Sequence, residues 1–211
     1  RRTAFGIWFN QGEVCTAGSR LIVEDKIKDE FLAKVMAIGQ KMMPGDPLDP
    51  KTQMGAMVDE TQTKRVMGYI DAGQKEGAKL AMGGKQVHID NAGSFIEPTV
   101  FDNVDNKMKI AQEEIFGPVL SVIPVKDAEQ ALTVANDTIY GLASAIFTSD
   151  INKAFKFAKN LRAGSVWVNT YDGGDITTPF GGYKQSGIGR DKSLHAFDKF
   201  TQVKTTWIQL G

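Results

Sequence analysis

Short continuous runs of apolar residues alternate along the chain with segments in which apolar residues recur at helical spacing. A helix is predicted after Asp25, where Ile27, Phe31, Leu32 and Val35 recur at helical spacing. Further helices are predicted at 3–10, from 59 to about 75, from 127 to about 136 and from 150 to about 162. Apolar runs bounded by turn residues predict strands at 21–23, 78–82, 95–101, 119–125, 141–148 and 165–169. Strands that alternate with helices indicate an α/β fold: a mostly parallel sheet flanked by helices.

Aspartates precede the predicted helices, and each is expected to act as an N-cap. They are Asp25, Asp59, Asp127 and Asp150. The pair Asp59 and Gln62 matches a capping box. After a short predicted helix at 194–200, residues 201–210 alternate in part and predict a detached strand that pairs with another element or another subunit.

Bulk composition excludes several classes of protein. Among 211 residues, 25 basic and 25 acidic side chains balance, so no net charge favours nucleic acid or an anionic membrane. The single cysteine forms no internal disulfide and suits a reducing, cytoplasmic compartment. The sequence shows no signal peptide and no apolar run of bilayer length. His88 and His195 are far apart and predicted to be surface residues, so no metal site is expected.

The chain begins at Arg1 without an initiator methionine, which processing or excision from a longer protein would explain. No segment matches a dinucleotide-binding fingerprint: Gly187-Ile188-Gly189 lacks both the third glycine and the preceding strand.

Cys15 is the first candidate for chemistry. It follows the turn former Gly12 and precedes the small residues Thr16, Ala17 and Gly18, which leave a sulfur approachable. We expect it at a helix start, where unpaired N–H groups favour a thiolate and stabilise an oxyanion. The alternative is an inert, buried cysteine.

Two further strings are unusual as pure structure. Glu113 and Glu114 precede Phe116-Gly117-Pro118, which suits a carboxylate aimed at sugar hydroxyls with an aromatic ring beside it. An acidic loop entering a strand is the alternative. Residues 178–190 form a long glycine-rich loop, which is either a surface loop or a close-packing element at a ligand.

Together, the strings Gln-Gly-Glu-Val-Cys, Glu-Glu-Ile-Phe-Gly-Pro and Pro-Phe-Gly-Gly-Tyr-Lys-Gln-Ser-Gly-Ile-Gly-Arg resemble the signatures of the aldehyde dehydrogenase superfamily, in the same order. The resemblance covers the whole chain. It implies a catalytic domain over 1–190, truncated at its N-terminus, and a C-terminal helix and oligomerisation strand over 191–211. It also implies that the cofactor-binding domain is absent from this chain. Residues 169–175 and 190–197 look most similar to γ-glutamyl-γ-aminobutyraldehyde dehydrogenases of putrescine degradation.

The resemblance implies a reaction and roles for particular residues. Cys15 would attack an aldehyde, and the resulting thioester would be hydrolysed to a carboxylate after hydride passes to NAD or NADP. The implied cofactor residues are Glu114, at the ribose, and Phe116, at the nicotinamide. The implied substrate residues are Val14, Thr16, Asp172 and Phe180. Asp172 or Asp175 would attract a substrate amino group, or both would face solvent.

In the family, a general-base glutamate and an oxyanion-hole asparagine precede the cysteine, and only 14 residues do so here. We therefore expect these 211 residues to be inactive alone and to expose an apolar face that promotes association. The full-length protein is expected to be a homo-oligomer, dimer or tetramer. The alternatives are a relative that passes the acyl group to coenzyme A, and a non-catalytic assembly module.

Overall fold

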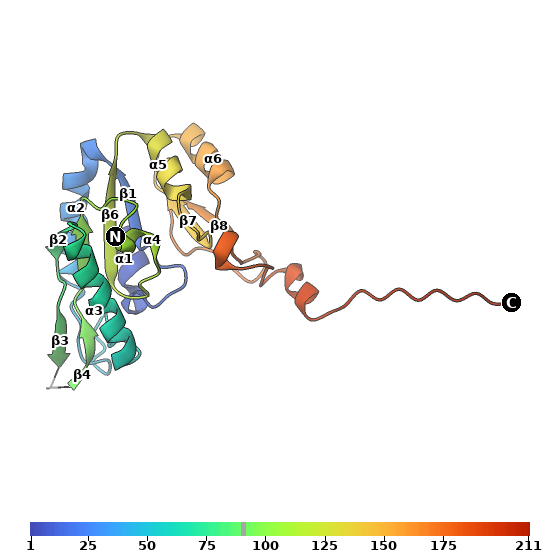
Figure 1. Cartoon of the computed structure of the whole chain (residues 1–211), viewed down its shortest axis with the longest axis horizontal. Helices are drawn as coiled ribbons and strands as arrows, with labels where there is room; N and C mark the ends of the chain where they lie inside the picture. Colours follow the sequence, from blue (N-terminus) through green and yellow to red (C-terminus); the bar gives the residue numbers. More distant parts are fainter. Residues whose placement is uncertain (90–91) are drawn as a thin grey trace.

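The larger sheet of the protein has four strands in the order β1-β6-β5-β2 (Figure 1). The computed structural model describes residues 1–89 and 92–211. The strands are β1 (Arg20–Glu24), β6 (Val119–Val125), β5 (Thr99–Asp102) and β2 (Lys79–Met82). β6 runs parallel to both β1 and β5, and the edge strand β2 is antiparallel to β5. The predicted α/β fold with a mostly parallel sheet is therefore confirmed.

Helices cover both faces of this sheet. Because successive residues of its central strands point in opposite directions, each of these strands contributes side chains to both faces. On one face, Val100 and Leu120 pack against α1 (Arg2–Trp8) and α2 (Asp25–Gly39). On the other face, Phe101 packs against α3 (Glu60–Lys75) and the short α4 (Lys109–Gln112). The two core clusters thus sandwich β5 and β6.

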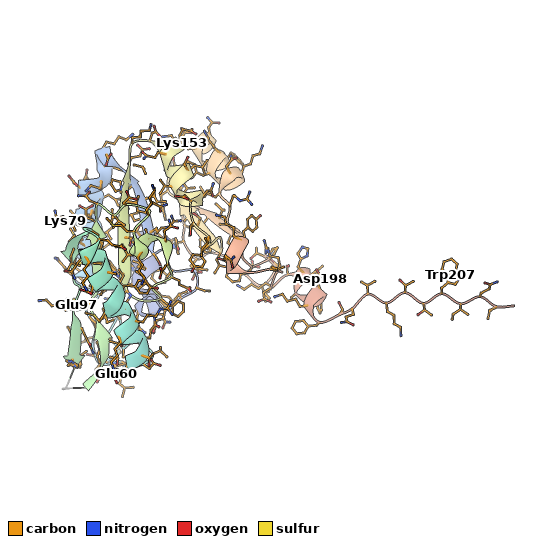
Figure 2. The ribbon with its side chains drawn as sticks, viewed as in Figure 1. Glu60, Lys79, Glu97, Lys153, Asp198 and Trp207 are labelled. Carbon is orange, nitrogen blue, oxygen red and sulfur yellow. The ribbon has the colours of Figure 1, made fainter. Side chains whose placement is uncertain are left out.

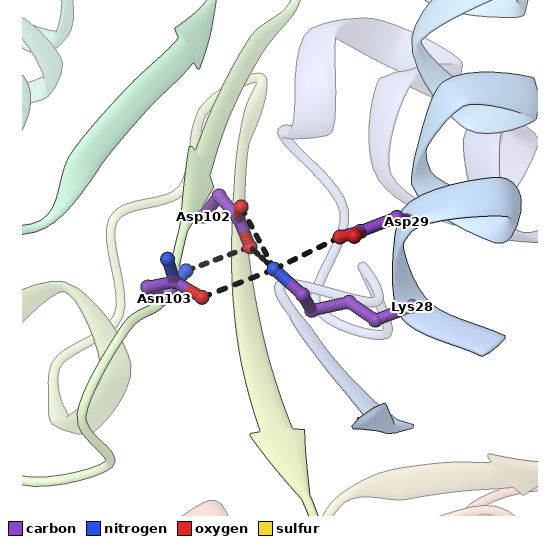
Figure 3. Close-up of polar contacts among 4 residues, drawn as sticks. All are labelled: Lys28, Asp29, Asp102 and Asn103. Atoms are coloured by element: carbon purple, nitrogen blue, oxygen red, sulfur yellow. Dashed lines mark hydrogen bonds and ion pairs between the residues drawn. The ribbon is translucent and has the colours of Figure 1, made fainter. Parts of the chain in front are cut away.

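A lysine fastens α2 to the end of β5 (Figure 3). The Nζ atom of Lys28 lies 2.9 Å from both carboxylate oxygens of Asp102, 3.0 Å from Oδ1 of Asn103 and 3.3 Å from Oδ1 of Asp29. Asp102 is itself buried, so this contact closes one end of the sheet–helix interface.

A second unit lies beside the sheet. β7 (Ala143–Ile146) and β8 (Ser165–Val168) form a separate parallel pair, connected by α6 (Ile151–Asn160). The helix α5 (Ala128–Asn136) leads from β6 to β7. We refer to residues 1–136 as the four-stranded region and to residues 141–200 as the two-stranded region. Among the described residues, both core clusters belong to the four-stranded region.

Two cations bind carbonyl groups at the C-terminus of α5, where these groups carry partial negative charge, and the second of them joins the two regions. Arg20 of β1 donates to the carbonyls of residues 134–135 at 3.1 and 3.0 Å. Lys184, in the short 3₁₀ turn η2 (Lys184–Ser186), donates to the carbonyls of Asn136 and Thr138, both at 2.9 Å. The glycine-rich loop is thus attached to the four-stranded region through Lys184.

The prediction of one strand over 95–101 was wrong. The segment is divided between β4 (Ala92–Ile96) and β5, with Glu97 and Pro98 in neither strand. A proline cannot donate a hydrogen bond to a neighbouring strand, so it separates them. β4 pairs antiparallel with β3 (Gln86–Ile89), which the sequence analysis did not predict.

The predicted caps are confirmed at three helices and wrong at one. The carboxylates of Asp59, Asp127 and Asp150 accept hydrogen bonds from N–H groups in the first turns of α3, α5 and α6. Asp25, however, is the first residue of α2, and the N-cap position is Glu24, whose side chain makes no cap bond. An acidic residue in the first turn still suits the helix dipole.

The C-terminal segment projects away from the rest of the molecule (Figures 1 and 2). It follows the 3₁₀ segment η3 (Leu194–Lys199), and residues 201–211 have no strand partner within the described chain. Its apolar side chains are exposed, including Val203 and the labelled Trp207. Within residues 1–89 and 92–211, no helix is both long and apolar enough to cross a membrane.

Candidate active site

Cys15 lies on a tight turn, and the prediction that it opens a helix was wrong. The short 3₁₀ segment η1 (Phe9–Gly12) ends in left-handed backbone, with φ of +75° at Gly12. The turn is closed by the N–H of Ala17, which donates to the carbonyl of Val14 at 2.9 Å. The chain then enters β1 directly, which leaves no room for a helix. The Cys15 side chain is exposed, so the alternative of a buried cysteine does not apply.

Some backbone N–H groups around this turn donate hydrogen bonds within the protein, and others do not. Gly18 donates to the carbonyl of Gly6 at 2.8 Å and Ser19 to that of Ala17 at 2.9 Å. In the described chain, the N–H groups of Cys15 and Thr16 donate to no protein acceptor. These two groups, rather than a helix N-terminus, are available to an oxyanion that forms on a carbonyl attacked by Cys15.

Close backbone contact fixes the turn against the loop that carries Glu114. A Cβ atom at Gly12 would lie 2.2 Å from the carbonyl oxygen of Gly117, so only glycine fits. The preceding segment is also tied to residues 55–58, since Gln11 accepts from the N–H of Gly55 at 3.0 Å. Glu13 accepts from the N–H of Val58 at 3.1 Å.

The pKa of Glu13 is raised. Partial burial of its carboxylate is the larger cause, the hydrogen bond from Val58 opposes it, and the nearby charge of Asp59 adds to it.

The loop of Glu114 and Phe116 is held through its backbone by α3. Arg65 donates to the carbonyl of Glu114 at 2.9 Å. The side-chain amide of Gln62 donates to the carbonyls of Ile115 and Phe116 at 3.0 and 2.8 Å. Phe116 has a φ of +58°, a conformation that costs energy for a residue with a side chain and persists only when neighbours impose it. The Gln62 contacts do so, and the exposed Glu114 carboxylate makes no bond to the described protein residues.

A cavity of about 720 Å³ brings most of the predicted residues together. Cys15, Val14 and Thr16 line it beside Glu114 and Phe116. Its walls include all of β1 and all of β7, so it lies between the two regions. The structure therefore places the predicted nucleophile and the predicted cofactor residues on one cavity.

Asp172 and Phe180 do not line this cavity. Asp172 lines a small neighbouring pocket with the stacked rings of Phe5 and Phe9, and also with Val14 and Thr16, which line both pockets. Phe180 lines neither pocket, and its backbone pairs with that of Asp191 at 2.8 and 2.6 Å. The carboxylate of Asp175, the alternative amine site, accepts from the backbone N–H of Thr177 at 2.7 Å.

Sequence reasoning missed several residues that shape the site. Gln62 was predicted to complete a capping box, yet its amide binds the Phe116 loop, and no spacing reveals that choice. Tyr171 was not identified, although its hydroxyl reaches the carbonyl of Thr16 at 2.6 Å across a separation of 155 residues. Among the residues that the structure describes, no cluster of three or more His, Cys, Asp or Glu side chains could hold a metal ion.

An exposed thiol on a turn, on one cavity with an exposed carboxylate and an aromatic ring, is a candidate for covalent chemistry on a bound ligand. The chain belongs to the aldehyde dehydrogenase family: the model of the "Aldehyde dehydrogenase family" matches residues 1–206.

Individual relatives are similar over nearly the whole chain. It is 50% identical over 208 residues to the "NADP/NAD-dependent aldehyde dehydrogenase PuuC" of Escherichia coli, which covers 99% of this chain and 41% of PuuC. The indole-3-acetaldehyde dehydrogenase AldA of P. syringae, solved with NAD+ and IAA, is 59% identical with a TM-score of 0.95, covering 99% of this chain and 42% of AldA.

The γ-glutamyl-γ-aminobutyraldehyde dehydrogenase of Burkholderia cenocepacia is 54% identical with a TM-score of 0.93, covering 97% of this chain and 41% of that structure. The chain thus spans about two fifths of the length of the relatives it matches.

Proposed function

We propose that this chain carries the nucleophile and part of the cofactor site of an NAD(P)+-dependent aldehyde dehydrogenase that oxidises an aldehyde to its carboxylate. The observation that carries the proposal is the cavity shared by Cys15, Glu114 and Phe116. Family membership and the names of the relatives support it.

The residues present fit a nicotinamide cofactor. Glu114 offers an exposed carboxylate, an acceptor suited to ribose hydroxyls, from a loop whose backbone is fixed by Gln62 and Arg65. Phe116 offers a flat apolar surface on the same cavity. When bound, such a cofactor supplies acceptance of a hydride.

The remaining chemistry is assigned to the protein. Cys15, as the thiolate, attacks the aldehyde carbon and forms a thiohemiacetal whose oxygen faces the N–H groups of Cys15 and Thr16. Once the thiohemiacetal carbon has lost its hydride to the cofactor and its hydroxyl proton to solvent, Cys15 would hold the acyl group as a thioester until water releases the carboxylate and regenerates the thiol. The relatives' greater length supports the further proposal that these 211 residues alone do not complete this cycle.

The test follows NADH formation by the full-length protein and by the 211 residues alone. Cys15→Ala is expected to lower kcat by at least about 10³-fold, as for loss of a covalent nucleophile. Ser19→Ala, a change at a nearby small residue, serves as the control. NADH formed by Cys15→Ala at the unmodified rate would refute the role of the thiol. Product that appears only with coenzyme A would identify the acylating alternative.

For the substrate, we propose an aminoaldehyde such as γ-glutamyl-γ-aminobutyraldehyde, which would place the protein in putrescine degradation. Asp172 is exposed, lines a pocket with Phe5 and Phe9, and could pair with a substrate ammonium. Asp172→Asn is expected to raise KM about threefold for an aminoaldehyde, as for loss of an exposed ion pair, and to leave it unchanged for indole-3-acetaldehyde. An equal change for both substrates would argue against this pairing.

We also propose that residues 201–211 pair with a second copy of the chain in a cytoplasmic homo-oligomer. Their extended backbone and exposed apolar side chains, such as Val203 and Trp207, support this. Size-exclusion chromatography with light scattering should show a smaller assembly when residues 202–211 are deleted. An unchanged assembly would disprove the role of the segment.

A further inference from the structure

The peptide unit between Thr16 and Ala17 is held at both of its polar atoms. Its N–H donates to the carbonyl of Val14 at 2.9 Å and so closes the turn around Cys15. Its carbonyl oxygen accepts from the hydroxyl of Tyr171 at 2.6 Å. Because a peptide unit is planar, fixing both atoms fixes the orientation of the unit directly after Cys15 and Thr16.

The ring of Tyr171 is fitted between two glycines. A Cβ atom at Gly6 of α1 would lie 3.1 Å from the ring, and one at Gly18 would lie 3.1 Å from the hydroxyl oxygen. These are the same two residues whose N–H and carbonyl join α1 to the turn at 2.8 Å. The ring therefore packs beside the connection between α1 and the turn that carries the thiol.

The loop that presents Tyr171 is itself anchored. Asn169 exchanges two hydrogen bonds with the backbone of Thr148, at 2.8 and 2.9 Å. The ring of Trp167 contacts that of Tyr171 with centroids 5.1 Å apart, and its N–H donates to the carbonyl of Gly173 at 2.6 Å. The two-stranded region thus supplies a fixed hydroxyl to the turn of the four-stranded region.

The hydroxyl stays protonated at working pH. The pKa of Tyr171 is well above its usual range, first because the side chain is buried and second because of the charge of Asp172. A phenol in that state donates a hydrogen bond to a carbonyl at neutral pH.

We propose that Tyr171 is a positioning residue for Cys15. Its hydroxyl fixes the Thr16–Ala17 peptide unit, and through it the direction of the Cys15 side chain and of the two available N–H groups. The proposal rests on the proposed function for its effect on aldehyde oxidation. It assigns Tyr171 no contact with substrate or cofactor.

The first test needs no catalysis. In Tyr171→Phe of the full-length protein, the ring still packs on Gly6 and Gly18 but no longer donates a hydrogen bond. Hydrogen exchange of the Ala17 and Gly18 amides is expected to be about tenfold faster, as for loss of one hydrogen bond to a buried carbonyl. Tyr183→Phe, whose ring instead contacts Arg190, is the matched control and should leave this exchange unchanged. Unchanged exchange in Tyr171→Phe would overturn the proposal.

The second test separates positioning from substrate contact and from general stability. Tyr171→Phe should lower kcat by about tenfold to a hundredfold, since small misplacements of a reacting group cost this much. The factor should be the same for short and long aldehydes, with KM for NAD unchanged. A fall confined to one aldehyde, or a general rise in exchange throughout the domain, would contradict the proposal. Faster exchange at the turn in a protein that oxidises no aldehyde would count against the proposed function while supporting the contact.

A second variant disturbs the same hydrogen bond between Tyr171 and Thr16 while leaving both of these residues unchanged. In Gly18→Ala the new methyl group meets the Tyr171 hydroxyl at 3.1 Å and displaces it while both residues remain. Exchange and kcat should change in the same direction as in Tyr171→Phe and by a smaller factor. Gly68→Ala, where a Cβ atom meets nothing within 4 Å, controls for the substitution itself. Equal effects of both alanine variants would overturn the assignment.

Discussion

In the four-stranded region, β5 and β6 are covered on both faces by helices, and the side chains that fill the space are almost inaccessible to solvent. In the two-stranded region, β7 and β8 are only partly buried, and α6 contributes just Ala154 and Phe157 to the buried apolar set. The two regions have similar elements, yet one has its own core and the other depends on contacts at its border.

The difference matters for the site because the groups of the proposed reaction fall on opposite sides of it. Cys15, Glu114 and Phe116 belong to the four-stranded region, where backbone contacts fix them. Of the predicted substrate residues, Asp172 and Phe180 belong to the two-stranded region, whereas Val14 and Thr16 lie on either side of Cys15 in the four-stranded region. Reaction and cofactor binding would thus depend on a packed core, and substrate selection on residues of both regions.

The largest expected effect compares one phenylalanine from each region. Phe101 is fully buried, and Phe101→Ala should lower the free energy of unfolding by about 3–5 kcal/mol. Phe157 of α6 lies outside both core clusters and borders the cavity, so Phe157→Ala should cost only about 1–2 kcal/mol. Denaturant titration measures both values. Equal costs would mean that the two regions share one core.

Hydrogen exchange sharpens this result. Phe157→Ala should speed exchange in β7 and β8 and leave β5 and β6 protected, because regions with few buried contacts open separately. Simultaneous loss of protection in all four strands would argue against separate regions.

The second prediction compares two glycines whose Cβ atoms would strike a carbonyl oxygen. At Gly12 the separation would be 2.2 Å from Gly117, and at Gly164 it would be 1.6 Å from Gly181. Gly12→Ala should nevertheless be worse, at about 3 kcal/mol, because its φ is +75° and Gly117 is buried between packed elements. Gly164→Ala should cost about 2 kcal/mol, because the Gly181 backbone must move but the backbone at residue 164 has no positive φ to disfavour alanine. Thermal unfolding of both variants checks the order, and a larger loss for Gly164→Ala would reverse the comparison.

Local patterns predicted most elements of the packed region but only part of the site. An aspartate cap and apolar residues at helical spacing predict helices α3, α5 and α6, and a continuous apolar run predicts β6. The string around Cys15 identified the thiol, yet not the turn that presents it, because that turn depends on contacts of Gly12 with Gly117. Tyr171 was missed for the same reason: its partner is 155 residues away.

The resemblance to a family predicts that Glu114 and Phe116 bind the cofactor, and the structure adds how their loop is held. Neither Gln62 nor Arg65 has a sequence pattern that points to the Phe116 loop, since contacts between elements distant in sequence leave no periodic signal. The cofactor roles of Glu114 and Phe116, like the substrate roles of Asp172 and Phe180, stay predictions.

The smallest expected effect compares two lysines with opposite pKa shifts. The pKa of Lys28 is raised mainly by its hydrogen bond to Asp102. The contribution of Lys28 to stability is therefore complete below the unfolded value of 10.5 and is lost as pH rises through the folded pKa. Burial, aided by the charges of Arg162 and Arg20, lowers the pKa of Lys184. Between the folded pKa and 10.5 the unfolded chain then binds more protons than the folded one, so this lysine makes stability rise with pH in that window.

Urea titrations between pH 8.5 and 11.5 separate the two contributions. Lys28→Gln should remove about 1 kcal/mol of the stability lost at the alkaline end. Lys184→Met should remove the opposing rise, so that its stability falls earlier than in the unmodified protein. The exposed Lys126→Gln controls for loss of a charge. The two pKa shifts have opposite signs only because the surroundings of the two lysines differ. The same dependence of stability on pH in Lys28→Gln and Lys184→Met would therefore show that the lysine within the packed region and the lysine at its border contribute equally to that dependence.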